Sequence, residues 1–289
     1  MTKSMANRMT LSWLIVLAAI FMFPLITTIS NSFMAPNEIS QNYNTRLSVF
    51  DLLDGTERNY VDIQLIPEEA CLSQYSDLIL GSPAFIILML NSLKLTLPVV
   101  VGNLLFSIFT AYGFTIWRWK HKETVFFVYI VVMLMPLQAV LVPNYIIAEN
   151  FGLTNSYLAI ILPGIFSPFG TFLLRQSMKA IPTDYLEAAR VDGAGTLRMF
   201  FSIVLPQMKS GMAALTMLVF IEYWNVVDQV IIFIKDSFKE PLSVFLSRMS
   251  GDSSSLIFAA SVLYLFLPLW FLTVGQKELE QGIELSGIK

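Results

Sequence analysis

The sequence predicts an all-α, polytopic membrane protein with six transmembrane helices and a small extracytoplasmic loop region after the first of them. Of the 289 residues, 55% are hydrophobic and only 13% are charged, whereas soluble domains carry roughly a quarter charged residues. The mean hydropathy is +0.66. The apolar residues gather in long segments, and a bilayer core of about 30 Å needs roughly 20 such residues for each helix.

The apolar segments lie at about 11–31, 84–117, 124–148, 156–174, 212–234 and 256–274. The second is too long for one plain span, so we expect a short lead-in helix at 85–90 and a span that begins at about Leu93. The fourth is predicted to be bent or interrupted, because it contains Pro163, Gly164, Pro168 and Gly170. Irregular backbone is tolerated at membrane depth only against protein or a water-filled cavity.

These segments divide the chain into four parts. They are an N-terminal tail with the first helix (1–31), an extracytoplasmic region (32–83), a core of five transmembrane helices (84–275) and a polar tail (276–289). Region 32–83 is rich in Asp and Glu. Two short strands at 46–53 and 59–66, joined by a turn at Asp54-Gly55, are one interpretation of it. A loosely packed loop is the other.

The placement of Lys and Arg predicts the orientation. With the N-terminus inside, the inner segments hold twelve of these residues: Lys3, Arg8, Arg118, Lys120, Lys122, Arg175, Lys179, Arg190, Arg198, Lys209, Lys277 and Lys289. The outer segments hold five: Arg46, Arg58, Lys235, Lys239 and Arg248. The positive-inside rule therefore predicts a multi-pass plasma-membrane protein with both termini and the loop at 175–210 in the cytoplasm.

Composition excludes several functions. The net charge of −3 gives no indication of nucleic-acid binding. The single cysteine, Cys71, excludes an internal disulfide and a cysteine-cluster metal site. The single histidine, His121, lies in a basic run that is typical of a solvated loop. The phosphate-binding pattern G-x-x-x-x-G-K-[ST] does not occur, so we expect no ATP hydrolysis by that machinery. We predict no catalytic residue, metal site or cofactor in this chain.

A polar stretch at 185–206 separates the fourth and fifth apolar segments. It is predicted to form a short helix, a glycine break and a second short helix. Thr183 is expected to cap the first helix, and Gly193 with Gly195 to end it. The second helix is expected to end at Leu205-Pro206.

Within the first short helix, Tyr185, Ala188, Ala189 and Asp192 share one side at spacings i, i+3, i+4 and i+7. The two alanines leave little bulk there, so another protein can approach the backbone closely. The alternative is a solvated loop helix in which Glu187 merely pairs with Arg190.

The same stretch resembles the EAA motif of ABC importer permeases. The match comprises Glu187-Ala188-Ala189, three further residues, Gly193, nine further residues and Ile203-Val204-Leu205-Pro206. The resemblance implies that this segment is the coupling helix, which sits in a cleft of an ATPase subunit. It assigns ATPase docking to Tyr185, Glu187, Ala188, Ala189, Asp192 and Gly193.

From about Asn91 onwards, over about two thirds of the chain, the sequence resembles the maltose-type (carbohydrate) branch of these permeases. The matching motifs include Met135-Pro136, the run 151–157, Ile161-Leu162-Pro163 and Trp224-Asn225. The resemblance implies a subunit of a bacterial inner-membrane importer that forms half of a translocation path. It also implies three kinds of protein partner, namely a second permease, an ATPase dimer that binds ATP and Mg, and an external solute-binding protein.

Polar residues in the fifth apolar segment are candidates for that path. Glu222, Asn225 and Gln229 are expected on one helix face at i, i+3 and i+7, with Asp228 beside them and Tyr223 nearby. Ionisable side chains at membrane depth usually face a bundle interior or cavity. The alternative is a hydrogen-bond network between helices. In the second segment, the stripe Asn103, Ser107 and Thr110 favours helix packing over substrate contact.

The leading hypothesis is thus a permease for a sugar or oligosaccharide. A polyol or glycerol-phosphate-like cargo is the alternative within the same class. A membrane-embedded enzyme would have only Glu222 and Asp228 to use, and a non-transporting scaffold would have no use for the EAA motif. Region 32–83 is interpreted as a surface for the binding protein or the partner permease. The tail at 276–289 either touches the ATPase dimer or frays.

Overall fold

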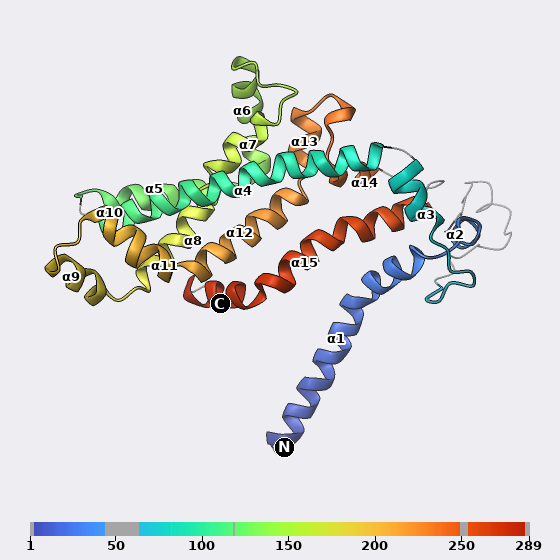
Figure 1. Cartoon of the computed structure of the whole chain (residues 1–289), viewed down its shortest axis with the longest axis horizontal. Helices are drawn as coiled ribbons and strands as arrows, with labels where there is room; N and C mark the ends of the chain where they lie inside the picture. The colour runs from blue at the N-terminus through green and yellow to red at the C-terminus, as the bar shows by residue number, and fades with distance from the viewer. Residues whose placement is uncertain (1–2, 44–63, 82, 118, 249–253, 287–289) are drawn as a thin grey trace. The chain divides into compact units, whose positions relative to one another are not determined.

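The computed structural model describes residues 3–43, 64–81, 83–117, 119–248 and 254–286 (Figure 1). Within these residues the chain is helical, and its only β-type pairing is an isolated bridge between Met34 and Ala70. The all-α prediction is therefore confirmed. The chain forms two compact units, Met1–Ile87 with Phe245–Phe266, and Leu88–Val244 with Leu267–Lys289.

In the first unit, helix α1 (Lys3–Asn31) precedes the short helices α2 (Pro36–Tyr43), α3 (Ser73–Ser76) and η1 (Asp77–Gly81). The segments that flank α2 and α3 are joined by hydrogen bonds. The Cys71 N–H donates to the Phe33 carbonyl at 2.7 Å, and the Gln74 amide donates to the Met34 carbonyl. Most of the two predicted strands and their Asp54-Gly55 turn lie outside the described residues, and residues 64–66 form no strand.

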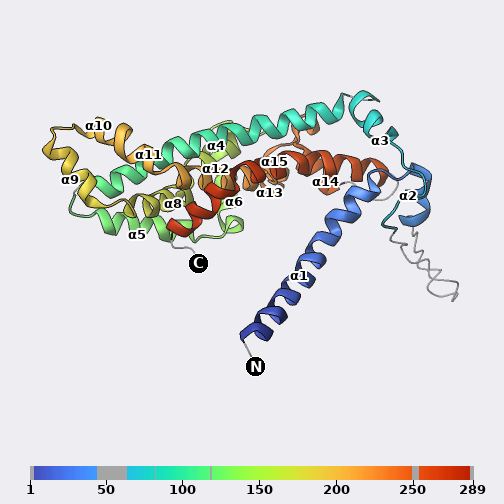
Figure 2. The same ribbon diagram turned by 60° about the horizontal axis from the view of Figure 1, so that its bottom comes forward.

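The second unit contains most of α4 (Ala84–Ile116) and the helices that follow it as far as η3. These are α5 (Lys122–Met133), α6 (Leu137–Asn150), α7 (Leu158–Ile165), α8 (Pro168–Lys179), α9 (Thr183–Val191), α10 (Thr196–Met199), η2 (Phe200–Val204), α11 (Leu205–Gln207), α12 (Lys209–Trp224), α13 (Asp228–Phe233) and η3 (Ser237–Lys239). The last two helices, α14 (Leu242–Arg248) and α15 (Ser254–Ser286), each contribute residues to both units. In both views α9 projects beyond the ends of α4 and α5 (Figures 1 and 2).

Helix α4 has 33 residues, most of which belong to the second unit. A stripe at i, i+4 spacing, formed by Leu95, Val99, Asn103, Ser107 and Ala111, is buried. The Asn103 amide donates to the Gly164 carbonyl at 2.9 Å and to the Ile165 carbonyl at 3.3 Å. These carbonyls lie where α7 ends, and the Gly164 carbonyl also accepts the Ser167 N–H at 3.3 Å. The polar stripe at Asn103 therefore serves helix packing, as predicted.

The spans differ in detail from the prediction. Four helical segments are long and apolar enough to cross a membrane, namely Met9–Asn31, Ala84–Ile116, Leu158–Lys179 and Leu256–Gln281. Two bent pairs raise the number to six if each pair is one span. Helices α5 and α6 meet at 97°, and Thr196–Gln207 meets α12 at 70°. These numbers apply to the described part of the chain.

Two helix boundaries also depart from expectation. The separate lead-in helix at 85–90 is wrong, because α4 continues without a break through Asn91 and Ser92. Both side chains are used elsewhere. Asn91 donates to the Phe238 and Glu240 carbonyls, and Ser92 Oγ accepts the Leu242 N–H. At the other end of the chain, α15 remains helical through Ser286, well into the predicted tail.

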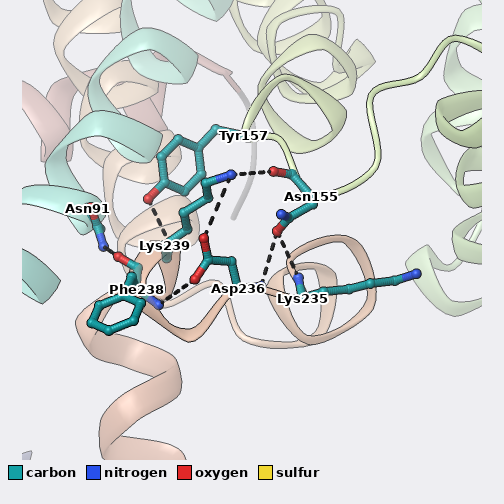
Figure 3. A network of polar contacts seen from close by, with 7 residues as sticks. All are labelled: Asn91, Asn155, Tyr157, Lys235, Asp236, Phe238 and Lys239. Carbon is teal, nitrogen blue, oxygen red and sulfur yellow. Dashed lines mark hydrogen bonds and ion pairs between the residues drawn. The ribbon is translucent and has the colours of Figure 1, made fainter.

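A polar network holds the loop between α13 and α14 (Figure 3). Asn155 adopts a φ of 59°, and its Oδ1 accepts the backbone N–H groups of Lys235 and Asp236, both at 3.1 Å. Lys239 Nζ donates to the Asn155 carbonyl, and the Tyr157 hydroxyl donates to the Lys239 carbonyl at 2.8 Å. Burial, and then the nearby Asp236 carboxylate, raise the pKa of Tyr157 to about 12, so its hydroxyl remains a donor.

Candidate functional site

Helix α9 begins one residue earlier than predicted, at Thr183, the residue expected to be its cap. Pro182 is the N-cap residue, with an extended backbone, and it offers no side-chain hydrogen bond. Thr183 is already the first helical residue, so the prediction that its side chain caps the helix is wrong. Asp184 lies in the first turn, where the positive end of the helix dipole stabilises a negative charge.

The end of α9 is a Schellman motif. Asp192 is the C-cap residue and Gly193 follows it with a φ of 75°. The Gly193 N–H donates to the Arg190 carbonyl at 3.1 Å, and the Ala194 N–H donates to the Ala189 carbonyl at 2.9 Å. This pair of bonds defines the motif. Gly193 therefore stops the helix as predicted, whereas Gly195 is instead the N-cap residue of α10.

The surface of α9 is mostly available to a partner. Five of the residues predicted to dock are exposed, namely Tyr185, Glu187, Ala188, Asp192 and Gly193. Ala189 is buried against its own chain, so its side chain is not part of that surface. Among the described residues, no ion pair joins Glu187 to Arg190, so the pairing in the alternative interpretation does not form.

Two apolar residues beside α9 were missed from the sequence. The side chain of Val191 is 88% exposed and that of Leu197 is 73% exposed. Isolated apolar residues on a polar stretch were the available signal, but their exposure depends on the turn at Gly193. Together with Tyr185 they add apolar surface to a segment that is otherwise polar.

The segment after α9 is anchored on α4. The Tyr112 hydroxyl donates to the Thr196 carbonyl at 3.1 Å, and the Phe200 ring contacts the rings of Phe109 and Tyr112. We expected the second helical piece to end at Leu205-Pro206, but it continues to Gln207. Pro206 lies in the first turn of α11, where its missing N–H costs no helical bond.

Arg175 anchors the other end of the loop at 175–210. Its guanidinium pairs with Glu123 at 2.6 Å, donates to the Phe114 carbonyl and lies 3.7 Å above the centre of the Phe126 ring. Its side chain is 2% exposed. The loop that carries α9 is thus attached to α4 and α5 through Arg175, and to α4 again through Tyr112.

A cavity of about 700 Å³ lies where three helices are broken. The breaks fall between α5 and α6, between α7 and α8, and between α12 and α13. Its wall comprises Val132, Met133, Met135, Leu137, Val140, Leu141, Asn144, Ala159, Pro163, Ser167, Pro168, Phe169, Leu218, Glu222, Tyr223, Gln229 and Phe233. The interruption predicted in the fourth apolar segment, between α7 and α8, therefore faces a cavity, as irregular backbone in a membrane requires.

Only some of the residues predicted for the translocation path line this cavity. Glu222, Tyr223 and Gln229 line it, whereas Asn225 and Asp228 do not. The single helical face predicted for Glu222, Asn225 and Gln229 is wrong, because α12 ends at Trp224 and α13 begins at Asp228. The Asn225 amide instead donates to the Ile221 carbonyl at 2.8 Å, at the end of α12.

Two polar wall residues, Asn144 and Ser167, were not singled out from the sequence. Asn144 lies one residue after Pro143 inside an apolar helix, and Ser167 lies one residue before Pro168, and those positions were the available signals. Gly164 matters as well, since a Cβ there would lie 2.7 Å from the Tyr223 hydroxyl oxygen.

The chemistry of the cavity is that of polar recognition. Glu222 is the only acidic wall residue, and no described Lys or Arg lines the cavity. Since Asp228 lies elsewhere, the pair of carboxylates that the enzyme hypothesis needed does not meet here. No group of three or more His, Cys, Asp or Glu side chains that could hold a metal occurs in the described part of the chain.

Residues 69–284 match the family described as binding-protein-dependent transport system inner membrane component. The chain belongs to this family. It is a multi-pass membrane protein, and the family is one of transport proteins rather than enzymes. The resemblance found in the EAA motif is thereby confirmed.

Similar proteins are permease proteins of several transport systems. The chain is 35% identical over 145 residues to the sn-glycerol-3-phosphate transport system permease protein UgpE of Yersinia pestis, covering 50% of this chain and 52% of UgpE. The match thus spans about half the length of that relative. The chain is 26% identical over 287 residues to the arabinooligosaccharides transport system permease protein AraQ of Halalkalibacterium halodurans, covering 96% and 97% of the two chains.

Solved structures share the fold. A chain of a bacterial ABC transporter involved in the import of the acidic polysaccharide alginate superimposes with a TM-score of 0.78 at 19% identity, over 96% of this chain and 98% of that one. A structure of the alginate transporter in complex with an alginate pentasaccharide-bound periplasmic protein gives a TM-score of 0.60 at 16% identity, over 93% of both chains.

Proposed function

We propose that this family member is the permease subunit of a bacterial ATP-driven importer for a sugar or oligosaccharide, and that it forms half of the translocation path. The cavity at the three helix breaks carries this proposal. Glu222, Tyr223, Gln229 and Asn144 supply a carboxylate, a phenol and two amides at its wall, and a few placed polar groups in an otherwise apolar cavity are typical of small-molecule sites. The names of the AraQ and alginate relatives support carbohydrate cargo.

The charge of the cavity favours a sugar over the alternative cargo. A glycerol-phosphate-like solute, as named for UgpE, would be expected to meet Arg or Lys, which pair with phosphate oxygens. The described wall offers neither and carries Glu222 instead. The second half of the path would come from a second permease subunit.

Uptake measurements test this part of the proposal. The chain would be expressed with its genomic-neighbour transport genes, and uptake of labelled oligosaccharides and glycerol phosphate would be compared. Glu222→Gln is expected to lower the uptake rate of the sugar by about tenfold, as loss of a charged hydrogen bond predicts. Asp228→Asn is the matched control, because Asp228 does not line the cavity. Equal loss from both variants would contradict the assignment of the cavity.

We further propose that α9 is the docking helix for the ATPase subunit that supplies the energy, with ATP and Mg bound by that partner. Three features support this. Its surface carries Ala188 and exposed Val191, its end is defined by the Schellman motif, and its loop is attached to membrane helices by Tyr112 and Arg175. A movement of α9 would thus reach α4 and α8.

Co-purification tests the docking role. The tagged chain would be purified in detergent with the ATPase encoded beside it, as wild type and as the double variant Glu187→Lys with Ala188→Asp. The wild type is expected to retain the ATPase and the variant to lose it, because both changes add charge or bulk to the proposed contact. Retention by both would leave α9 as a solvated loop helix.

An external solute-binding protein is the remaining partner of the proposed importer. The family description and the alginate complex support it. The proposal also places both termini and α9 in the cytoplasm and the loop between α13 and α14 outside, as the distribution of Lys and Arg predicts.

A further inference from the structure

A second cavity, of about 980 Å³, lies between the C-terminal half of α4 and the segment α9–α10. From α4 it is lined by Phe106, Phe109, Thr110, Gly113, Phe114 and Ile116, and from the loop after α4 by Trp117 and Trp119. Arg190, Thr196 and Met199 form the opposite wall. This cavity shares no wall residue with the one at the three helix breaks.

The cavity continues an exposed apolar stripe on α4. Leu97, Val101, Leu105 and Phe109 follow one another at i, i+4 spacing and are all about half exposed, on the side opposite the buried stripe that begins at Leu95. The next position of the stripe is Gly113. A Cβ at Gly113 would meet nothing within 4 Å, so the missing side chain leaves a notch in the stripe.

Among the residues that the structure describes, Arg190 is the only charged one that lines this cavity. It is exposed, and its guanidinium makes no hydrogen bond or ion pair with any described residue. A guanidinium presents several N–H donors in a plane that matches phosphate oxygens. Apart from Thr110 and Thr196, the rest of the described wall is apolar and aromatic, so the cavity offers a site for an anion next to a mostly apolar channel.

Trp117 and Trp119 indicate the depth at which the cavity opens. Both are exposed, and tryptophan is enriched at the membrane–water interface, where its ring meets both environments. Lys120, directly after Trp119, is exposed as well. Basic residues in such a position attract anionic headgroups on the cytoplasmic side of a membrane.

We propose that this cavity binds one anionic phospholipid of the surrounding bilayer, with its phosphate on Arg190 and an acyl chain against Phe109, Gly113 and Trp117. We assign the lipid to the cytoplasmic leaflet, and this assignment rests on the orientation given in the proposed function. A lipid fits better than a protein segment, because the apolar wall runs into a stripe along a membrane-spanning helix. One lipid molecule would then contact both α4 and the docking helix.

Native mass spectrometry of the full chain in detergent tests this inference, with phosphatidylglycerol and phosphatidylcholine titrated separately. The wild type is expected to bind one phosphatidylglycerol. Arg190→Gln is expected to weaken that binding about fivefold, since a basic residue near a membrane surface contributes about 1 kcal/mol, and to reduce the preference over phosphatidylcholine. Gly113→Leu fills the notch and is expected to abolish retention of either lipid.

Arg198→Gln is the matched control, because Arg198 is an exposed basic residue of the same loop that does not line the cavity. It is expected to bind phosphatidylglycerol as the wild type does. Arg190 is exposed, so its variant reports on binding even if Gly113→Leu does not fold.

The inference would be overturned if Arg190→Gln and a folded Gly113→Leu both bound phosphatidylglycerol as tightly as the wild type does. A second pair of results would also overturn it: the wild type binds no lipid, and Gly113→Leu loses the second permease or the ATPase. In that case a protein, and not a lipid, would fill the cavity. The lipid measurement uses the chain without its ATPase. A chain that binds the lipid but no ATPase would therefore refute the docking role and leave the lipid site intact.

Discussion

Asn155 joins two loops through its side chain and its backbone. Its Oδ1 accepts two N–H groups from the start of the loop after α13, and its φ of 59° lies in the left-handed region that asparagine tolerates better than most residues. The side chain and the backbone therefore contribute separately, and two substitutions can distinguish their contributions.

We expect Asn155→Gly to lower the free energy of unfolding by about 1 kcal/mol, through loss of the two side-chain bonds. Asn155→Ala should cost about 1 kcal/mol more, because alanine is also strained at a positive φ. Thermal unfolding in detergent measures both, with the neighbouring Thr154→Ala as control. An alanine variant as stable as the glycine variant would mean that the backbone relaxes.

Arg175 attaches the loop at 175–210 to α4 and α5. We expect Arg175→Lys to lower the free energy of unfolding by about 2 kcal/mol, because an ammonium group cannot replace the charge-assisted bond to Glu123 and the contact with the Phe126 ring together. Glu123→Gln should cost less, since its carbonyl oxygen still accepts. Thermal unfolding tests the order, with the exposed Lys179→Gln as control. The reverse order would show that the negative charge matters more than the guanidinium geometry.

At the scale of the element, the end of α9 decides whether the docking helix keeps its shape. Gly193 and Gly195 form a natural pair for comparison. An added Cβ meets nothing within 4 Å at either position, but only Gly193 has a positive φ. Any difference between their substitutions therefore comes from the backbone and not from a steric clash.

We expect Gly193→Ala to cost about 1 kcal/mol or more of local stability, to fray the last turn of α9 and to reduce the ATPase recovered by co-purification. Gly195→Ala should leave recovery unchanged. Circular dichroism of both purified chains checks that the membrane helices are intact. Equal recovery from the two variants would indicate that the ATPase does not need the Schellman turn.

At the scale of the whole molecule, the orientation in the membrane can be measured directly. Cys71 is the only cysteine, so a Cys71→Ser chain accepts single reporter cysteines. Val191→Cys and Phe238→Cys replace side chains that are 88% and 80% exposed. A membrane-impermeant maleimide is expected to label position 238 in intact spheroplasts and position 191 only after permeabilisation. Labelling of position 191 from outside would refute the cytoplasmic placement of α9.

Some of this protein is determined by local sequence alone. The apolar segments predict the all-α membrane class because hydrophobic length is a property of consecutive residues. The α9 turn is equally local, since Gly193 can adopt the required φ without help from distant residues. The EAA spacing also lies within one short stretch, which is why the family resemblance needed no structure.

The cavity and the loop anchors depend on tertiary structure. Glu222 and Gln229 were predicted on one helix face, yet they meet at a cavity because the chain breaks after Trp224, and Asn144 and Ser167 join them from other helices. Ala189 was assigned to the docking surface but is buried by its own chain. Arg175 appeared only as one of the basic residues of the loop at 175–210, and its pairing with Glu123 spans 52 positions. The length of the apolar segments predicts which parts of the chain form membrane helices. It does not predict where a helix breaks against a cavity, because that depends on side chains contributed by distant segments.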